Sequence, residues 1–124
     1  YGASTQGART MSRYAPHKWL LVQVVSPTPH FRIFGVWSGS YPEGESWRLN
    51  SGVDGVVERE DHFEIVGSSG SVYEIGKKSY GSTARGHHII DGVVKQHTGI
   101  FGDDTACILD EADALKILED WTDA

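Results

Sequence analysis

The stretch His30–Trp37 (HFRIFGVW) decides the fold of this chain. Its apolar residues stand at both odd and even positions, so both faces of an extended strand would be apolar. One face carries Phe31, Ile33, Gly35 and Trp37, and the other carries Arg32, Phe34 and Val36. A strand that is apolar on both faces is covered on both sides. The stretch therefore predicts a strand in the interior of a sheet.

Shorter segments with apolar or β-branched character lie on both sides of this stretch. The expected strands are His17–Val25, Trp47–Asn50, Val53–Arg59, His62–Val66, Ser71–Ile75 and Thr105–Leu109. A further candidate strand is His87–Val94, interrupted at Asp91-Gly92. Turn residues separate them at 26–29, 38–46, 50–52, 60–61 and 67–70, and residues 76–86 are expected to form a loop. Phe63, Ile65 and Val72, with Tyr73 or Ile75, are expected to form cross-strand pairs.

One helix is expected, at Asp110–Trp121. Asp110 can cap its first turn, because a carboxylate accepts hydrogen bonds from the free backbone donors there. Ala114, Leu115, Leu118 and Trp121 recur at three- and four-residue spacing and form one apolar face. That face must pack against something, most simply the sheet.

The length of 124 residues is that of a single domain. We expect a mainly β (α+β) fold: a strongly curled antiparallel sheet or small barrel of six or seven short strands, with one C-terminal helix packed on it. The 15 glycines permit the bulges and corners of such a sheet. Residues 1–10 have no apolar periodicity and are expected to be a flexible arm or a leader before Met11. Residues 11–124 are expected to form a single globular β-rich domain.

Composition and charge exclude several classes of function. Eleven basic and 17 acidic residues give a net charge of −6, which disfavours nucleic acid as a partner because phosphate binding needs a basic surface. No apolar run approaches the roughly 18 residues needed to span a bilayer, so no membrane association is expected. No signal peptide is visible, which favours the cytoplasm. The single Cys107 allows no internal disulfide and lies in an apolar context that predicts burial.

No spacing of residues points to a metal, a cofactor or a catalytic group. His87 and His88 are adjacent, so on a strand they would point to opposite faces and could not hold one ion together. The serines lack the Gly-x-Ser-x-Gly pattern of a nucleophile elbow. We therefore expect no metal, no cofactor and no catalytic residue that can be named.

The aromatic residues around two loops are the strongest indication of binding. Tyr and Trp offer a large rigid surface with a polar group, which suits the binding of small ligands or proteins. Neighbouring arginines could hold an anion. The candidate binding residues are Trp37, Tyr41, Trp47, Arg48, Tyr73, Tyr80, Arg85 and His87. The alternative is that the tryptophans are core residues at strand ends.

Some segments resemble small uncharacterised proteins of bacteria and of mobile elements such as phages and integron gene cassettes. The resemblance lies in Ser46–Gly52 (SWRLNSG), the acidic hairpin Glu58–Glu64 and Ser69–Tyr73 (SGSVY), and extends to Tyr80-Gly81 and Ile89-Ile90. It covers residues 37 to about 91 and consists of turns and strand aromatics. It implies no activity.

Three functional hypotheses remain. The first is a small non-enzymatic binding module that engages a protein or a small molecule through its loop aromatics. The second is a small hydrolase or isomerase, with His87 or His88 beside Asp91 or Asp103 in a pocket. The third is an acidic inhibitor or immunity-type protein, because residues 103–124 carry eight carboxylates and only Lys116. A homodimer would form readily if an edge strand is left unpaired.

Overall fold

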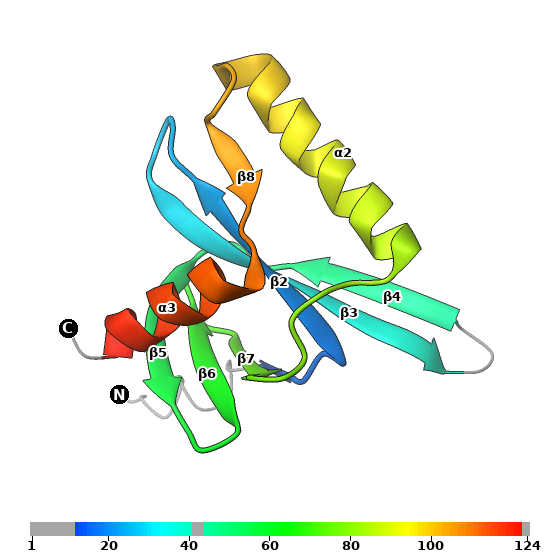
Figure 1. Ribbon diagram of the computed structural model, residues 1–124, viewed down its shortest axis with the longest axis vertical. Coiled ribbons are helices and arrows are strands. Elements are labelled where there is room, and N and C mark those ends of the chain that lie inside the picture. Colours follow the sequence, from blue (N-terminus) through cyan, green and yellow to red (C-terminus); the bar gives the residue numbers. More distant parts are fainter. Residues whose placement is uncertain (1–11, 41–43, 123–124) are drawn as a thin grey trace, which may run out of the picture.

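The computed structural model describes residues 12–40 and 44–122. These residues form a mainly β fold of eight strands in two four-stranded sheets, together with the helices α2 and α3. The sheets are not closed into a barrel. In Figure 1, β2 and β3 cross the middle of the molecule, with α2 on one side and α3 with the second sheet on the other.

The first sheet has the strand order β4-β3-β2-β8 and is antiparallel throughout. Its strands are β2 (Lys18–Val24), β3 (His30–Ser40), β4 (Gly44–Leu49) and β8 (Ala106–Ile108). β3 lies in the interior of the sheet, as its double apolar pattern predicts. It continues to Ser40 instead of ending at Trp37, with an irregularity in its pairing to β4 after Trp37.

The second sheet has the order β1-β7-β6-β5. Its strands are β1 (Arg13–Tyr14), β5 (Val53–Glu58), β6 (His62–Gly67) and β7 (Val72–Gly76). The predicted pairs form between β6 and β7, where Phe63 lies opposite Ile75 and Ile65 lies opposite Tyr73. β1 was not predicted, and it departs from an antiparallel sheet because it pairs with β7 in parallel.

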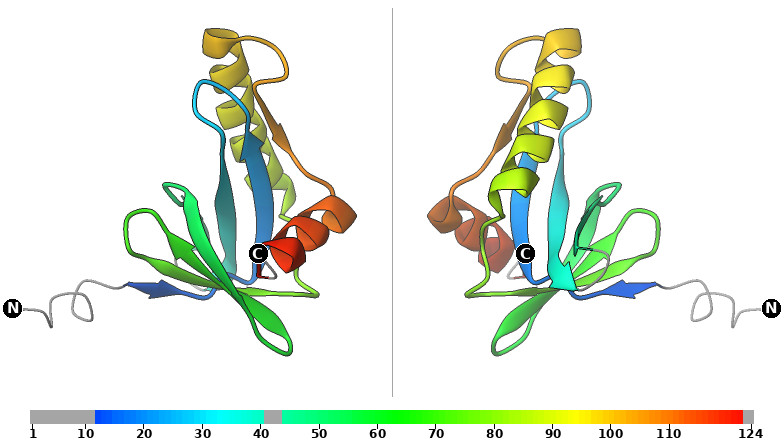
Figure 2. Two further views of the ribbon diagram at one scale, coloured as in Figure 1. Left: turned by 90° about the vertical axis from the view of Figure 1, so that its left-hand side faces the viewer. Right: turned by 90° about the vertical axis from the view of Figure 1, so that its right-hand side faces the viewer.

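Two apolar cores lie on the two faces of the β2–β3 pair, since side chains alternate along each strand. The inner core lies towards the second sheet and α3, and its buried members are Trp19, Leu21, Ile33, Val53, Phe63, Ile65, Tyr73, Ile75, Ala114 and Leu118. The outer core lies under α2, and its buried members are Leu20, Val22, Val24, Phe34, Val36 and Ile90. Figure 2 shows β2 and β3 upright, with α2 running alongside them and the second sheet at their lower end.

Asn50 holds the point where the chain passes from the first sheet to the second. Its side chain is buried, and its Oδ1 accepts a hydrogen bond of 2.8 Å from the backbone N–H of Ile33. Its Nδ2 donates to the carbonyl of Gly52 at 3.2 Å, and its own carbonyl accepts from Nε of Arg32 at 2.8 Å. A buried amide that is satisfied on both ends fixes this turn tightly.

α3 (Glu111–Thr122) confirms the predicted C-terminal helix. The carboxylate of Asp110 accepts a hydrogen bond of 2.8 Å from the backbone N–H of Asp113, which is the expected capping contact. Ala114 and Leu118 are fully buried in the inner core.

α2 (Ala84–Phe101) corrects the prediction for the preceding region, where a loop and the strand His87–Val94 were expected. Thr83 caps the helix, because its Oγ1 accepts from the backbone N–H of Gly86 at 3.0 Å. Ile90 and Val94 are four residues apart and both pack on the outer core. Burial of this helical stripe outweighs the low helix propensity of the β-branched residues and glycines.

Candidate functional site

Three of the predicted binding residues gather around one residue that was not predicted, Tyr14. The ring of Trp37 contacts that of Tyr14 edge-on with centroids 6.2 Å apart, and the ring of Tyr73 lies 5.1 Å from it. The guanidinium of Arg48 lies 4.4 Å above the Tyr14 ring. We call Tyr14, Trp37, Arg48 and Tyr73 the Tyr14 cluster. A shallow hollow of about 260 Å³ borders it.

Tyr73 and Tyr80 have structural roles. Tyr73 is only 1% exposed, and burial raises its pKa to about 12. Tyr80 packs against Trp19, with ring centroids 4.6 Å apart. Its hydroxyl donates to the carbonyl of Leu109 at 2.5 Å and accepts from the N–H of Leu21 at 3.1 Å. Burial also raises the pKa of Tyr80 to about 12. Tyr73 is thus buried in the inner core, and Tyr80 is partly buried against both cores.

Arg85 and His87 lie apart from the Tyr14 cluster, whereas Trp47 contributes to the hollow beside it. Trp47 is adjacent to Arg48 in β4, so it points to the opposite face and packs on the outer core. The guanidinium of Arg85, on α2, lies 5.7 Å from its ring centroid. His87 is exposed on α2. Tyr41, the remaining predicted binding residue, lies outside the described residues.

The other candidate groups also lie on open surfaces. His88 and Asp91 are exposed on α2, and Asp103 is exposed in the turn after it. In the described part of the chain, no group of three or more His, Cys, Asp or Glu residues could hold a metal ion. Cys107 is exposed on the edge strand β8, so the predicted burial of its thiol is wrong. Its apolar neighbours Ala106 and Ile108 face inwards because residues alternate along the strand.

A larger hollow, of about 680 Å³, lies where three turns meet at one end of the second sheet. The sequence did not predict it. We call it the His62 pocket, and its lining residues are Ala15, Glu60, Asp61, His62, Glu74, Gly76, Lys77, Lys78 and Ser79. They come from the β5–β6 turn, the end of β7, the turn that follows it and the segment after β1. This volume lies within the usual range for small-molecule sites.

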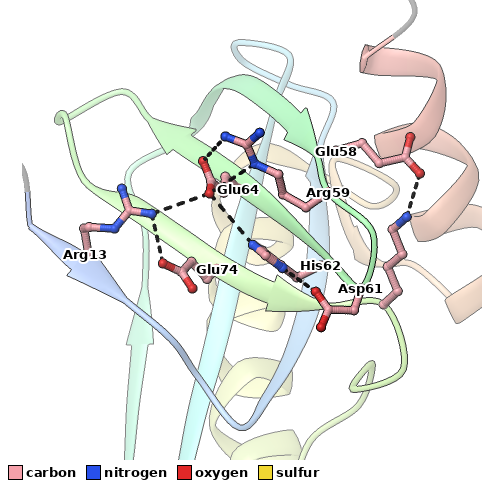
Figure 3. Close-up of polar contacts among 8 residues, drawn as sticks. Arg13, Glu58, Arg59, Asp61, His62, Glu64 and Glu74 are labelled. Atoms are coloured by element: carbon pink, nitrogen blue, oxygen red, sulfur yellow. Dashed lines mark hydrogen bonds and ion pairs between the residues drawn. The ribbon is translucent and has the colours of Figure 1, made fainter.

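His62 is held between two carboxylates in this pocket (Figure 3). Its Nδ1 lies 2.6 Å from Oδ1 of Asp61, and its Nε2 lies 3.8 Å from Oε2 of Glu64. The hydrogen bond from His62 lowers the pKa of Asp61 below its usual value. The imidazole is therefore a positioned part of the wall, with each ring nitrogen directed at a carboxylate oxygen.

Arginines neutralise the carboxylates along the outer face of the second sheet. Glu64 and Glu74 lie directly opposite each other on β6 and β7, where two like charges would repel. Arg13 lies 2.9 Å from Glu74 and 3.6 Å from Glu64. Arg59 contacts both oxygens of Glu64 at 3.3 Å and lowers the pKa of that carboxyl. These four side chains are thus paired with one another (Figure 3).

Two charged groups at the pocket are left uncommitted. Lys77 pairs with Glu58, its Nζ lying 2.7 Å from Oε2. Within residues 12–40 and 44–122, Lys78 and Glu60 take part in no hydrogen bond or ion pair, and both are exposed. The pocket therefore offers one free cation and one free carboxylate beside the hydroxyl of Ser79.

No model of a protein family, no curated protein and no solved structure matches this chain. Among the helices in the described residues, none is both long and apolar enough to cross a membrane. Sequence reasoning missed the His62 pocket because its charges were interpreted as ordinary turn residues. The available signal was the run Glu60-Asp61-His62 in one turn and Lys77-Lys78 in another.

Proposed function

We propose that this protein is a small non-enzymatic binding module, and that the His62 pocket binds a small zwitterionic molecule of the amino acid or short peptide class. One observation carries the proposal. The His62 pocket, of about 680 Å³, is lined by Glu60 and Lys78, two opposite charges that pair with no other side chain in the described part of the chain. A small-molecule partner was expected from the sequence at the loop aromatics. The pocket proposed here is a different site, and none of its lining residues is aromatic apart from His62.

The charges of the pocket match the two ends of such a ligand. A ligand ammonium group would lie near Glu60, the carboxylate of the pocket that has no partner among the described residues. A ligand carboxylate would pair with Lys78 and accept a hydrogen bond from Ser79. Because the paired side chains around Glu64 are already held in place, the ligand would bind without reordering the wall.

The orientation of His62 supports binding over acid–base catalysis. A general base needs a ring nitrogen within reach of the proton that it removes. Here Nδ1 is engaged by Asp61 and Nε2 is directed at Glu64. His62 therefore serves as a fixed wall residue, and Lys78 and Glu60 provide the recognition.

The proposal is tested by nuclear magnetic resonance titration of the labelled full chain with free amino acids and dipeptides. We expect shift changes at Glu60–His62, Glu74 and Lys77–Ser79 that saturate with ligand. Blocked derivatives, acetylated at the amine or amidated at the carboxyl, should bind more weakly because each loses one charge pair. A buried charge-assisted contact contributes about 1.5–3 kcal/mol, and these exposed contacts should contribute less.

Lys78→Ala and Glu60→Gln should each weaken binding while the folded spectrum is retained, since both side chains are exposed. Lys116→Ala is the matched control, because Lys116 is exposed on α3 and pairs with Asp120 there. Saturable shifts that map elsewhere, or equal binding by the Lys78→Ala variant, would show that the proposed site is wrong.

The Tyr14 cluster supports a second candidate function, the binding of an acidic peptide segment of a partner protein. The specific observation is that the exposed Arg48 guanidinium lies over the Tyr14 ring beside the half-buried Trp37. A cation next to aromatic rings suits a carboxylate flanked by apolar side chains. Trp37→Ala and Arg48→Ala test it better than changes at Tyr73 or Tyr80, whose loss would damage the core. Unchanged peptide capture by both variants would remove this candidate.

The acidic C-terminal segment leaves a further candidate function, an inhibitor or immunity-type protein that binds a basic target. For an acidic inhibitor, the described carboxylates of residues 103–122 already have some local roles: Asp110 caps α3 and Asp120 pairs with Lys116 at 3.1 Å. Binding to a basic target should then weaken steeply with salt. A cytoplasmic location, which the single cysteine favours, is proposed alongside and suits the exposed thiol of Cys107.

A further inference from the structure

Helix α2 leaves most of its surface without a protein partner. It is 18 residues long, yet only Gly86 and Ile90 are buried. Three large apolar side chains in its second half are exposed, at 37% for Val93, 67% for Ile100 and 48% for Phe101. Single exposed apolar residues are ordinary, but a group of them on one helix marks an interaction surface.

Two of these exposed residues, Val93 and Ile100, share one stripe with the exposed Gln96 and with Ile89, which is partly buried against the outer core. Ile89, Val93, Gln96 and Ile100 follow each other at spacings of four, three and four residues, which keeps them on one face of a helix. Two shallow hollows border this stripe, one of about 320 Å³ beside Ile89 and one of about 180 Å³ between Val93 and Ile100. We call these four residues the α2 seam.

Two glycines flank the seam at positions where the fold has room for a larger side chain. Gly92 and Gly99 are seven residues apart on the same side of α2, and a Cβ added to either would meet nothing within 4 Å. Glycine is the least favourable residue in a helix interior after proline. Small residues beside an apolar seam allow a second helix to approach closely, which gives these positions a purpose.

The charges at the two ends of the seam are complementary to each other. Arg85 lies in the first turn of α2, and Asp103 and Asp104 follow its last turn, all of them exposed. A second copy of α2 laid antiparallel, with the two-fold axis between Val93 and Gln96, brings Ile89 opposite Ile100. The same arrangement brings Arg85 of each copy to the acidic turn of the other copy, so the match occurs twice.

We propose that the α2 seam is the interface of a homodimer in which two copies of this chain pair through antiparallel α2 helices. Ile100 of each copy fills the hollow beside Ile89 of the other. α2 lies at the opposite end of the molecule from the β5–β6 turn, which lines the His62 pocket (Figure 1). The inference therefore does not depend on the proposed function.

Sedimentation and light scattering of the purified full chain test the proposal. We expect a concentration-dependent particle of twice 13.6 kDa. Ile100→Asp should raise the dimer dissociation constant by roughly 30-fold or more, because it places a charge against Ile89 of the other copy at both ends of the seam. Arg85→Glu should also weaken the dimer, and Arg85→Lys should restore most of it. Val57→Asp is the matched control, since Val57 is 41% exposed on β5, far from α2.

A crosslink tests the antiparallel register directly. In a Cys107→Ser background, Ile89→Cys combined with Ile100→Cys should form disulfide-linked dimers on mild oxidation, and either single change should not. A particle that remains monomeric at about 1 mM chain would overturn the proposal. A dimer that is unaffected by Ile100→Asp would overturn it equally, because the interface would then lie elsewhere.

Discussion

The two helices are both regular and both capped, yet they are held to the fold very differently. α3 spans 12 residues and places Ala114 and Leu118 among the ten buried residues of the inner core. α2 spans 18 residues and contributes Ile90 alone to the six buried residues of the outer core. The length of a helix therefore does not predict how firmly it is attached to the rest of the protein. The buried apolar area predicts this better, because burial provides most of the stability of a helix in a protein.

Each helix has one large side chain that is fully buried, Leu118 in α3 and Ile90 in α2. Leu118→Ala should lower the free energy of unfolding by about 3 kcal/mol, since the cavity opens in the inner core between both sheets. Ile90→Ala removes an apolar side chain of similar size, but the loss of stability that it causes should be confined mainly to α2. Urea unfolding followed by tryptophan fluorescence measures the first effect.

Amide hydrogen exchange separates the two variants. In the Ile90→Ala variant, exchange should accelerate along Ala84–Phe101 and much less in β5, β6 and β7. In the Leu118→Ala variant, protection should fall across both sheets. Equal acceleration in the second sheet by both variants would show that α2 is as firmly integrated as α3, and the comparison would fail.

Tyr80 joins the two helices, and its removal sharpens the comparison. Its hydroxyl accepts a hydrogen bond from the N–H of Leu21 and donates one to the carbonyl of Leu109, which lies just before α3. The residues that follow Tyr80 in the chain lead into α2. Tyr80→Phe leaves both backbone groups without this partner and should cost about 1–3 kcal/mol. Tyr14→Phe, measured by the same urea unfolding, is the control for loss of a tyrosine hydroxyl. Equal small losses would indicate that water replaces the bridge.

The helix caps should give smaller effects of similar size. Asp110→Ala and Thr83→Ala each remove a capping acceptor and should cost about 1 kcal/mol. Thr83 also donates to Oε1 of Glu45 at 2.8 Å, so its replacement should cost slightly more. Thr83→Ser keeps both hydrogen bonds and is expected to retain most of the stability. A larger loss at Asp110 than at Thr83 in thermal unfolding would contradict this order.

Much of the fold could be predicted because its signals are local. The alternation in His30–Trp37 placed β3 in the interior of its sheet, and Gly70, at φ 95°, forms the turn expected between β6 and β7. The capping residue and apolar face of α3 likewise lie within a few residues of each other. α2 was missed because β-branched pairs and two glycines concealed its helical spacing at Ile90 and Val94.

The candidate sites depend on contacts between distant residues, which composition and spacing do not reveal. The His62 pocket joins Asp61 and His62 to Lys78 across two turns, and the Tyr14 cluster needs the short parallel strand β1. Trp37 and Arg48 were predicted and do meet, because Trp37 pairs with Ser46 and Gly35 pairs with Arg48 across β3 and β4. Tyr73 and Tyr80 were predicted from sequence to be loop aromatics, but strand pairing in β7 buries Tyr73, and a bridge to Trp19 holds Tyr80 partly buried.

High pH tests the role of Tyr80 in holding the segments next to both helices, without a substitution in the core. Burial raises the pKa of Tyr73 and Tyr80 from 10.0 to about 12, so the folded state holds these protons more tightly than the unfolded chain does. That stabilisation is fully present below pH 10.0 and is lost as the pH rises through about 12. Ultraviolet absorbance should show two tyrosines ionising late, and one in the Tyr80→Phe variant. Tyr80 bonds to Leu109 just before α3 and itself lies just before α2. The amides of α2 and α3 should therefore lose their protection from hydrogen exchange together as Tyr80 ionises. If α2 alone detaches first, its attachment depends on Ile90 and not on this shared tyrosine.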